Sequence, residues 1–279
     1  ARTNIFAFRA APVQILYLYE GTMGAKFMDY VIADHTVIPD RLKEYYQEKI
    51  IYLPHTYMPT DNTKEISDTV MTRKDMGLPE DGFVFCCFNN NYKITPREFD
   101  IWMRLLDKVE GSVLWLRHSN NSITNNLKKE AEQRGVDPSR LVFTKRLSTE
   151  DHLARHRLAD LFLDTFNFNA HSTACDALWA GLPIITKKGE QFVARCASSF
   201  LNAIELPELI TNTEKEYEDL ALELATNKTL LSSITKKLAD NRLSTPLFNT
   251  EQYTKDLEKA LEKAYSHYRH QIPPKDIWI

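Results

Sequence analysis

The sequence predicts an α/β fold built around a parallel sheet, with helices closing the chain. Between residues 83 and 206, short apolar runs alternate with helix-length amphipathic segments. Runs that are apolar throughout are typical of strands buried on both faces. Strands and helices that alternate in this way indicate a Rossmann-like lobe with right-handed crossovers. The five runs that we assign to strands are 83–88, 113–116, 141–144, 161–164 and 183–186.

Capping residues mark where the helices of this lobe begin. Thr95 and Glu98 flank Pro96 in the pattern of a capping box, which predicts a helix over residues 95–110. Ser148 opens a second helix in the same way. Ligands of parallel sheets bind beyond the carboxyl ends of the strands, so we expect functional side chains in the loops that precede these helices.

The two ends of the chain differ from this lobe. Residues 1–60 contain three strand-like runs and little helix, too few elements to bury an apolar core by themselves. From residue 213 onward the pattern is helical, with helices expected over 213–227, 228–241 and 250–268. We therefore divide the chain into the end of a neighbouring lobe (1–60), a polar hinge (61–80) and a lobe with its closing helices (81–279).

Composition argues against several classes of function. The net charge is −3 and no basic stripe stands out, so we expect no nucleic-acid partner. The longest apolar runs are far shorter than the roughly 18 residues of a membrane span, so we expect no membrane partner. The 8 glycines form neither a dinucleotide-binding fingerprint nor a P-loop. The sequence begins at Ala1 without a methionine, and we expect a piece of a longer protein.

Metal and disulfide chemistry are not supported either. The four cysteines show no Cys-x-x-Cys spacing, and no Asp-x-Asp motif is present. We expect no metal and no other cofactor. The best interpretation of the four cysteines is that they are buried free thiols in a reducing cytoplasm. They are Cys86, Cys87, Cys175 and Cys196.

A lysine lies in the loop between the first strand of the lobe and the helix capped by Thr95. The ammonium group of Lys93 could reach the crevice there and neutralise negative charge on a departing diphosphate. A solvated loop lysine is the common alternative. The residues alone leave these two interpretations about equal.

Residues 167–176 join the fourth strand to a third helix. Free N–H groups, the hydroxyls of Ser172 and Thr173, and the helix dipole together make an anion site. Asp176, one turn into the helix, could accept hydrogen bonds from a ribose diol. The alternative is a plain capping box formed by Thr173 and Asp176. His171 and the asparagine-rich approach, which no cap requires, favour binding.

His152 and Arg155 lie one turn apart on the helix opened by Ser148. An imidazole can stack on a base, and a guanidinium can donate to a carbonyl oxygen. The pattern continues through His156 and Arg157, so a solvated helix face is the alternative. The residues alone favour that alternative.

These motifs together resemble the catalytic region of O-linked N-acetylglucosamine transferases. The resemblance spans nearly the whole chain and implies an enzyme with a GT-B fold, in which two Rossmann-like lobes hold the donor in their cleft. It also implies inversion at the anomeric carbon without a metal. The segments that carry it are 88–94 (FNNNYKI), 112–116 (SVLWL), 171–173 (HST), 176–181 (DALWAG), 244–250 (STPLFNT), 11–14 (APVQ) and 21–30 (GTMGAKFMDY).

The resemblance implies roles for residues around the diphosphate. Lys93 matches the lysine that stabilises the leaving diphosphate, and Asn90 lies where the family often has a glutamine facing the phosphates. His171, Ser172 and Thr173 match the start of the pyrophosphate-binding helix.

The resemblance also implies which residues bind the nucleoside. Asp176 matches the ribose ligand, and His152 with Arg155 matches the pair that stacks on uracil and reads it. The family usually has a lysine near the ribose where this chain has Thr149, so we expect the nucleotide to be supported differently.

The sugar pocket departs from the family pattern. Its loop contains Leu18, Gly21 and Thr22 and is one residue shorter than the family's Gly-Tyr-Pro-Gly-Thr. The sugar is therefore the least determined part of the donor. The insert that animal members carry after residues 54–56 is absent, which is typical of bacterial members.

The resemblance implies a transferase that moves N-acetylglucosamine from UDP to serine or threonine of a protein or peptide acceptor. Most of the N-terminal catalytic lobe and the tetratricopeptide repeats of such proteins are missing here, so we expect this chain alone to be inactive. A donor of GDP-fucose or UDP-glucose is one alternative, although His152 and Arg155 favour uracil over guanine. A non-catalytic nucleotide-sugar-binding module is another, against which Lys93 argues.

Overall fold

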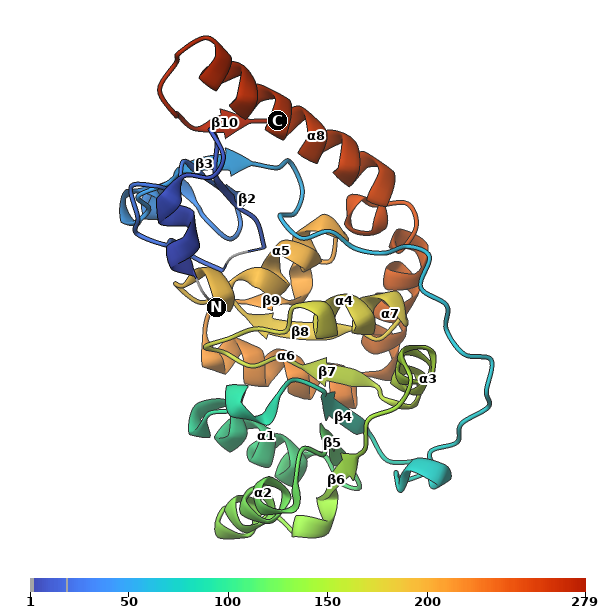
Figure 1. The fold of residues 1–279 in the computed structure, drawn as a ribbon. Coiled ribbons are helices and arrows are strands. Elements are labelled where there is room, and N and C mark those ends of the chain that lie inside the picture. Colours follow the sequence, from blue (N-terminus) through green and yellow to red (C-terminus); the bar gives the residue numbers. More distant parts are fainter. Residues whose placement is uncertain (1–2, 19) are drawn as a thin grey trace.

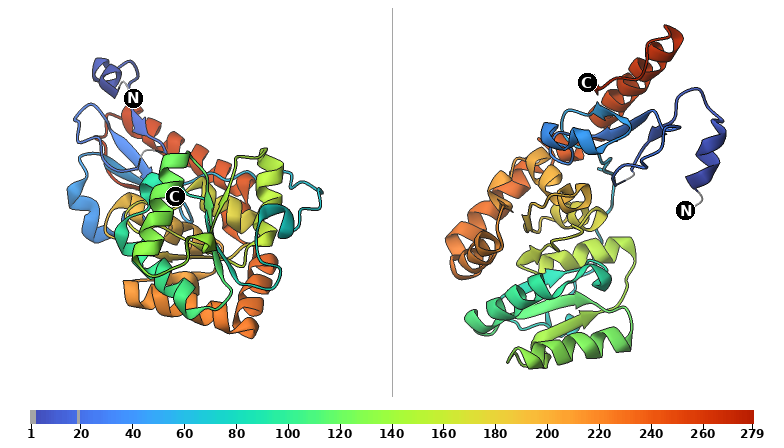
Figure 2. Two further views of the ribbon diagram at one scale, coloured as in Figure 1. Left: turned by 90° about the horizontal axis from the view of Figure 1, so that it is seen from below. Right: turned by 90° about the vertical axis from the view of Figure 1, so that its left-hand side faces the viewer.

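The computed structural model describes residues 3–18 and 20–279, so that Ala1 and Tyr19 of the segments discussed above lie outside the described residues. Two parallel sheets form the centres of two layered bodies, one above the other (Figure 1). A long extended segment runs from the first sheet to the second along one side of the molecule. The last helix returns to the first sheet, beside the N-terminal strands (Figure 2).

The larger sheet has six strands in the order β6-β5-β4-β7-β8-β9, and every pairing is parallel. The predicted α/β class and its five strands are therefore confirmed. No sequence signal predicts β9, which has only two residues. The strands are β4 (Val84–Cys87), β5 (Val113–Arg117), β6 (Leu141–Thr144), β7 (Leu161–Leu163), β8 (Ile184–Lys187) and β9 (Ile210–Thr211).

Helices cover this sheet and extend beyond it. The predicted starts are confirmed by the caps: Glu98 accepts a 2.8 Å hydrogen bond from the Thr95 N–H, and Ser148 Oγ accepts one of 3.1 Å from the Asp151 N–H. Gly181 ends α4 with φ of 87°, a left-handed conformation that favours glycine. The helices are α1 (Pro96–Lys108), α2 (Asn121–Gln133), α3 (Thr149–Arg155), α4 (Ser172–Trp179), α5 (Cys196–Ala203), α6 (Glu214–Thr226), α7 (Lys228–Asn241) and α8 (Thr250–Arg269).

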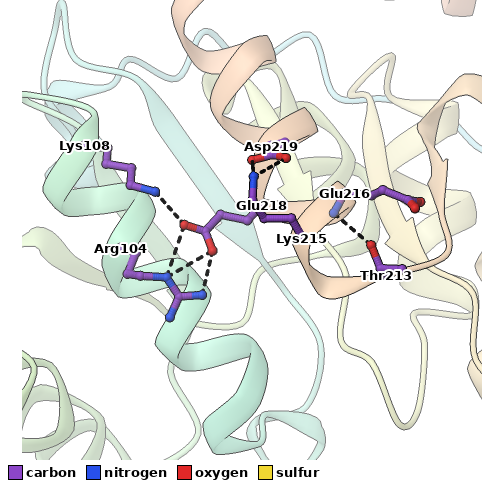
Figure 3. A network of polar contacts seen from close by, with 7 residues as sticks. All are labelled: Arg104, Lys108, Thr213, Lys215, Glu216, Glu218 and Asp219. Carbon is purple, nitrogen blue, oxygen red and sulfur yellow. Dashed lines mark hydrogen bonds and ion pairs between the residues drawn. The ribbon is translucent and has the colours of Figure 1, made fainter.

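A charged network joins α1 to α6 on the surface of this lobe (Figure 3). Glu218 of α6 accepts hydrogen bonds from Arg104 at 2.6 Å and from Lys108 at 2.7 Å, both of which lie on α1. Arg104 first, and Lys108 with it, lower the pKa of Glu218 to about 2. The side chain of Glu218 is 10% exposed, so the charge that joins these two helices is largely shielded from solvent.

The smaller sheet has the strand order β1-β2-β3-β10 and is also parallel. Its last strand comes from the C-terminus, and α8 packs on the same sheet through Ala260 and Ala264. The C-terminal residues thus complete the core that residues 1–60 cannot form by themselves. The strands are β1 (Ile15–Leu16), β2 (Tyr30–Ala33), β3 (Lys49–Tyr52) and β10 (Ile277–Trp278).

The segment between the two sheets, which the sequence predicts to be a hinge, is held at several points. Thr60 Oγ1 donates to the carbonyl of Leu247, just before α8. The Ser67 N–H donates to the carbonyl of Glu150 in α3, at 3.2 Å. The segment therefore crosses the outside of the larger lobe close to α3 and α4.

The expected burial of four free thiols is confirmed, since all four cysteines are buried and free. Within the described part of the chain, no helix combines the length and apolarity that a membrane span requires.

Candidate nucleotide-binding site

A cavity of about 400 Å³ lies beyond the carboxyl ends of β4, β5, β6 and β7. It brings together five of the residues proposed from the sequence, which are contributed by two separate helices. Its walls are formed by Phe88, Arg117, Arg146, Leu147, Ser148, Thr149, His152, Arg155, Ser172, Thr173 and Asp176. The loops that the parallel sheet directs to one edge thus form a single pocket.

The cavity has a strongly positive wall. Its lining contains the guanidinium groups of Arg117, Arg146 and Arg155, and Asp176 supplies its single carboxylate. Guanidinium groups bind phosphate oxygens in a bidentate manner, which makes such a lining suitable for a polyanion.

One end of the cavity is aromatic. The Arg155 guanidinium lies 4.6 Å from the centre of the Phe88 ring, and its Nη1 donates to the carbonyl of Lys145 at 2.8 Å. The His152 ring lies edge-on to Phe88, with 5.6 Å between the ring centres. Burial, and then the charge of Arg155, lower the pKa of His152 to about 4. A neutral imidazole beside a fixed guanidinium is suited to a flat heterocycle that offers carbonyl oxygens.

The solvated helix face that was the alternative is wrong for Arg155 and His156, while Arg157 is exposed as that alternative expects. Arg155 is 4% exposed and His156 is fully buried. His156 Nδ1 lies 2.7 Å from the carbonyl oxygen of His152, and burial lowers the pKa of His156 to about 3. His152 and Arg155 of α3, and His156 directly after this helix, therefore lie against the ring of Phe88, the residue that follows β4.

The other end of the cavity is the start of α4. None of the described residues accepts a hydrogen bond from the backbone N–H of Ser172 or Thr173. The capping box proposed as an alternative is absent, because Thr173 Oγ1 donates instead to Asn89 at 2.6 Å and Asp176 binds Lys64 at 2.7 Å. Unpaired N–H groups at the positive end of a helix dipole bind anions.

Lys93 lies beside this helix start but does not line the cavity. Its Nζ donates to the carbonyl of Asn169 at 2.8 Å and lies 4.0 Å from the centre of the Phe168 ring. Burial lowers the pKa of Lys93. The ammonium is thus fixed on the loop that leads to His171, where it adds positive charge next to the start of α4.

Asn90 also lies outside the cavity lining. Its side chain is exposed, and its Oδ1 accepts a hydrogen bond from Arg117, whose guanidinium does line the cavity. In this structure Asn90 therefore contacts the site through Arg117.

The expected sugar loop reaches the site through a residue that the sequence did not single out. Leu18 is exposed, and Thr22 Oγ1 donates to Glu48. Neither these two residues nor Gly21 lines the cavity. Between them, Glu20 Oε1 lies 2.5 Å from Nδ1 of His171.

Three further residues that sequence reasoning missed either line this cavity or bind a residue that lines it. Arg117 ends β5, so its position at the carboxyl end of a predicted strand was a usable signal. Phe88 follows β4 and resembles an ordinary core residue in the sequence. Lys64 comes from the connecting segment, where no periodicity or cap indicates a function.

The sequence matches the profile of glycosyl transferase family 41 over residues 1–69 and 59–257. The chain belongs to this family. The chain is 38% identical over 281 residues to a probable UDP-N-acetylglucosamine–peptide N-acetylglucosaminyltransferase, SEC, of Arabidopsis thaliana. The match covers 98% of this chain and 29% of that relative. A Caenorhabditis elegans UDP-N-acetylglucosamine–peptide N-acetylglucosaminyltransferase is 29% identical over 385 residues, with 98% of this chain and 33% of the relative covered.

A solved structure agrees with this assignment. The present chain is similar to an O-GlcNAc transferase mutant (K341M) of Thermobaculum terrenum, with a TM-score of 0.88 and 28% identity. The similarity covers 97% of this chain and 51% of that one. The GT-B fold expected from the resemblance is therefore confirmed. The chain spans about a third or less of the length of these curated relatives.

Proposed function

We propose that the protein to which this chain belongs transfers N-acetylglucosamine from UDP to serine or threonine hydroxyls of proteins, and that this chain binds the UDP part of the donor. The observation that carries the proposal is the single cavity that unites His152, Arg155, Ser172, Thr173 and Asp176. The names of the relatives, which specify a UDP-N-acetylglucosamine donor and a peptide acceptor, support the same reaction.

The two ends of the cavity match the two ends of UDP. The base is assigned to the aromatic end, where neutral His152 stacks on uracil and Arg155 donates to a uracil carbonyl. The diphosphate is assigned to the start of α4, with the free N–H groups of Ser172 and Thr173. Asp176, one turn along α4, is assigned to the ribose between them.

The positive charge around the diphosphate suggests how the leaving group is stabilised. The start of α4 and Lys93 beside it concentrate positive charge where negative charge collects as the glycosidic bond breaks. On this basis we propose that UDP binds without a divalent ion. The four buried free thiols fit a reducing compartment, and we place the reaction in the cytoplasm.

Calorimetric titration of the chain with UDP, GDP and uridine, each with and without EDTA, tests this proposal. We expect UDP to bind more tightly than GDP or uridine, and EDTA to have no effect. Tighter binding of GDP would indicate a GDP-sugar donor instead. Loss of UDP binding on chelation would contradict metal-free binding, and no binding of any nucleotide would overturn the proposed function.

A further inference from the structure

Lys64 brings a second charge to the carboxylate assigned to the ribose. Its Nζ lies 2.7 Å from Oδ1 of Asp176, although the two residues are 112 positions apart in the sequence. The side chain of Lys64 is 29% exposed and that of Asp176 is 16% exposed. Asp176 lines the cavity, and Lys64 reaches the site through its bond to this carboxylate. Among the described residues, no group donates a hydrogen bond to Oδ2 of Asp176.

The backbone of this segment is held without the ammonium group. Trp179 Nε1, one turn further along α4, donates to the carbonyl oxygen of Lys64 at 3.0 Å. The neighbouring residues Thr60 and Ser67 are fixed by hydrogen bonds of their own. The charge of Lys64 is therefore not required to hold the segment against the lobe.

The pair has the donors and acceptors that a vicinal diol needs. Asp176 has a free carboxylate oxygen that can accept from one hydroxyl, and the ammonium of Lys64 has two N–H donors beyond the one that binds Asp176. Each ribose hydroxyl can both donate and accept. A lysine–aspartate pair can thus satisfy the diol more completely than a carboxylate alone.

The charges of the cavity give Lys64 a second effect. Asp176 is the single carboxylate of a lining that otherwise suits a polyanion, and it lies on the same helix as the residues assigned to the diphosphate. An unpaired carboxylate would repel the diphosphate. Lys64 neutralises that charge while it leaves one carboxylate oxygen free.

We infer that Lys64 is a specificity residue for the donor nucleotide, which with Asp176 recognises the ribose diol. The inference rests on the proposed function, because it takes UDP as the ligand. It assigns to the connecting segment a direct role in selecting a ribonucleotide over its deoxy forms.

The test compares UDP, 2′-deoxy-UDP and 3′-deoxy-UDP by calorimetry in wild type, Lys64→Met and Lys64→Arg. We expect wild type to prefer UDP over at least one deoxy form by about tenfold, the value of one hydrogen bond to a charged group. Lys64→Met should bind UDP roughly tenfold more weakly and lose most of that preference. Lys74→Met, an exposed lysine of the same segment, is the matched control and should behave as wild type.

Lys64→Arg tests whether recognition of the diol needs the free oxygen of Asp176 or only a positive charge at position 64. A guanidinium keeps the charge but tends to bind both oxygens of a carboxylate, so Asp176 would have none left for the diol. We expect this variant to fold like wild type and to lose the preference for UDP. Unchanged ratios in both Lys64 variants would overturn the inference, even if UDP bound more weakly. Failure of wild type to bind UDP would instead overturn the proposed function.

Discussion

Glu20 and His171 join the two bodies, with Glu20 Oε1 2.5 Å from Nδ1 of His171. Glu20 belongs to the loop after β1, and His171 is the residue that precedes α4. A carboxylate therefore stands beside the helix start to which the diphosphate is assigned. It orients the imidazole, and it also adds a negative charge next to an anion site.

Glu20→Gln should separate these two effects. The glutamine side chain keeps an oxygen that can accept from Nδ1, but it removes the repulsion between the carboxylate and the diphosphate. We expect UDP to bind roughly threefold more tightly and uridine, which has no phosphate, to bind as in wild type. Calorimetry at low and high salt measures both, and the gain should shrink with salt. A matching gain for uridine would show that the loop contacts the nucleoside instead.

Ser172→Ala and Asp176→Ala should have different ligand profiles. Asp176 is assigned to the ribose, so its loss should weaken UDP and uridine alike, by about ten- to hundredfold. Ser172→Ala keeps the backbone N–H but removes the hydroxyl, which we also assign to the diphosphate, so it should weaken UDP while uridine binding stays almost unchanged. Titration of both variants with both ligands provides the measurement. Equal effects of the two changes on uridine would mean that these placements are wrong.

His152 of α3 and His156, which directly follows this helix, should make the fold sensitive to mild acid. Burial lowers the pKa of His156 to about 3 and that of His152 to about 4, below the value of about 6.5 in an unfolded chain. The unfolded state then binds more protons, so this stability is complete above about pH 6.5 and is lost as the pH falls toward the folded values. Each histidine should lower the free energy of unfolding by about 2 kcal/mol between about pH 7 and about pH 5.

Urea unfolding at these two pH values measures that loss, and His156→Gln is the informative variant. Because glutamine does not titrate, the variant should lose about 2 kcal/mol less than wild type on acidification. An identical pH dependence in the variant would show that His156 is protonated in the folded state.

The sequence could predict the larger sheet and the edge at which the site lies, because both depend on local signals. Capping residues such as Thr95 and Ser148 mark where loops become helices, and the ends of parallel strands share one edge of the sheet. The roles of individual residues in this cavity came from the resemblance, since His152 and Arg155 alone resemble a solvated face.

The remaining features arise from contacts between distant parts of the chain. Lys64 meets Asp176 only because the connecting segment crosses α4, and Ile277 pairs with Ile51 only because α8 returns to the first sheet. A two-residue strand such as β10 is too short to have a periodicity from which it could be predicted. Glu20 was overlooked because its partner His171 lies on another lobe.

The network between α1 and α6 should stabilise the lobe to a measurable extent. Glu218→Gln removes the charge that Arg104 and Lys108 share (Figure 3), and we expect a loss of about 1–2 kcal/mol, since both cations are half exposed and partly screened. The contribution of Glu218 is present above about pH 4.5 and is lost as the pH falls toward its folded pKa of about 2.

An exposed pair on the same helix provides the control for that measurement. Lys215 and Asp219 form an ion pair in which both side chains are more than half exposed. Asp219→Asn should therefore change the free energy of unfolding by less than about 0.5 kcal/mol. Urea denaturation of both variants gives the comparison, and equal losses would mean that burial of Glu218 contributes nothing.

The last prediction concerns what this chain does alone: it should bind UDP but not transfer sugar. Every residue that lines the cavity lies between Phe88 and Asp176, on one folded lobe, and Lys64, which binds Asp176, belongs to this chain as well, so we expect this chain to be sufficient for nucleotide binding. The first sheet has four short strands, and the chain covers 29% of its Arabidopsis relative. The acceptor groove is therefore expected on parts that are not present here.

Transfer requires acceptor hydroxyl, anomeric carbon and leaving phosphate to be aligned, and alignment of this kind lowers a barrier by several kcal/mol. We expect that the nucleotide-binding lobe alone cannot position the acceptor hydroxyl. A transfer assay with radiolabelled UDP-N-acetylglucosamine and a serine- or threonine-containing peptide measures turnover, and UDP calorimetry on the same sample shows that the lobe is intact. We expect binding without turnover. Steady turnover by this chain would mean that the acceptor site lies within residues 3–279.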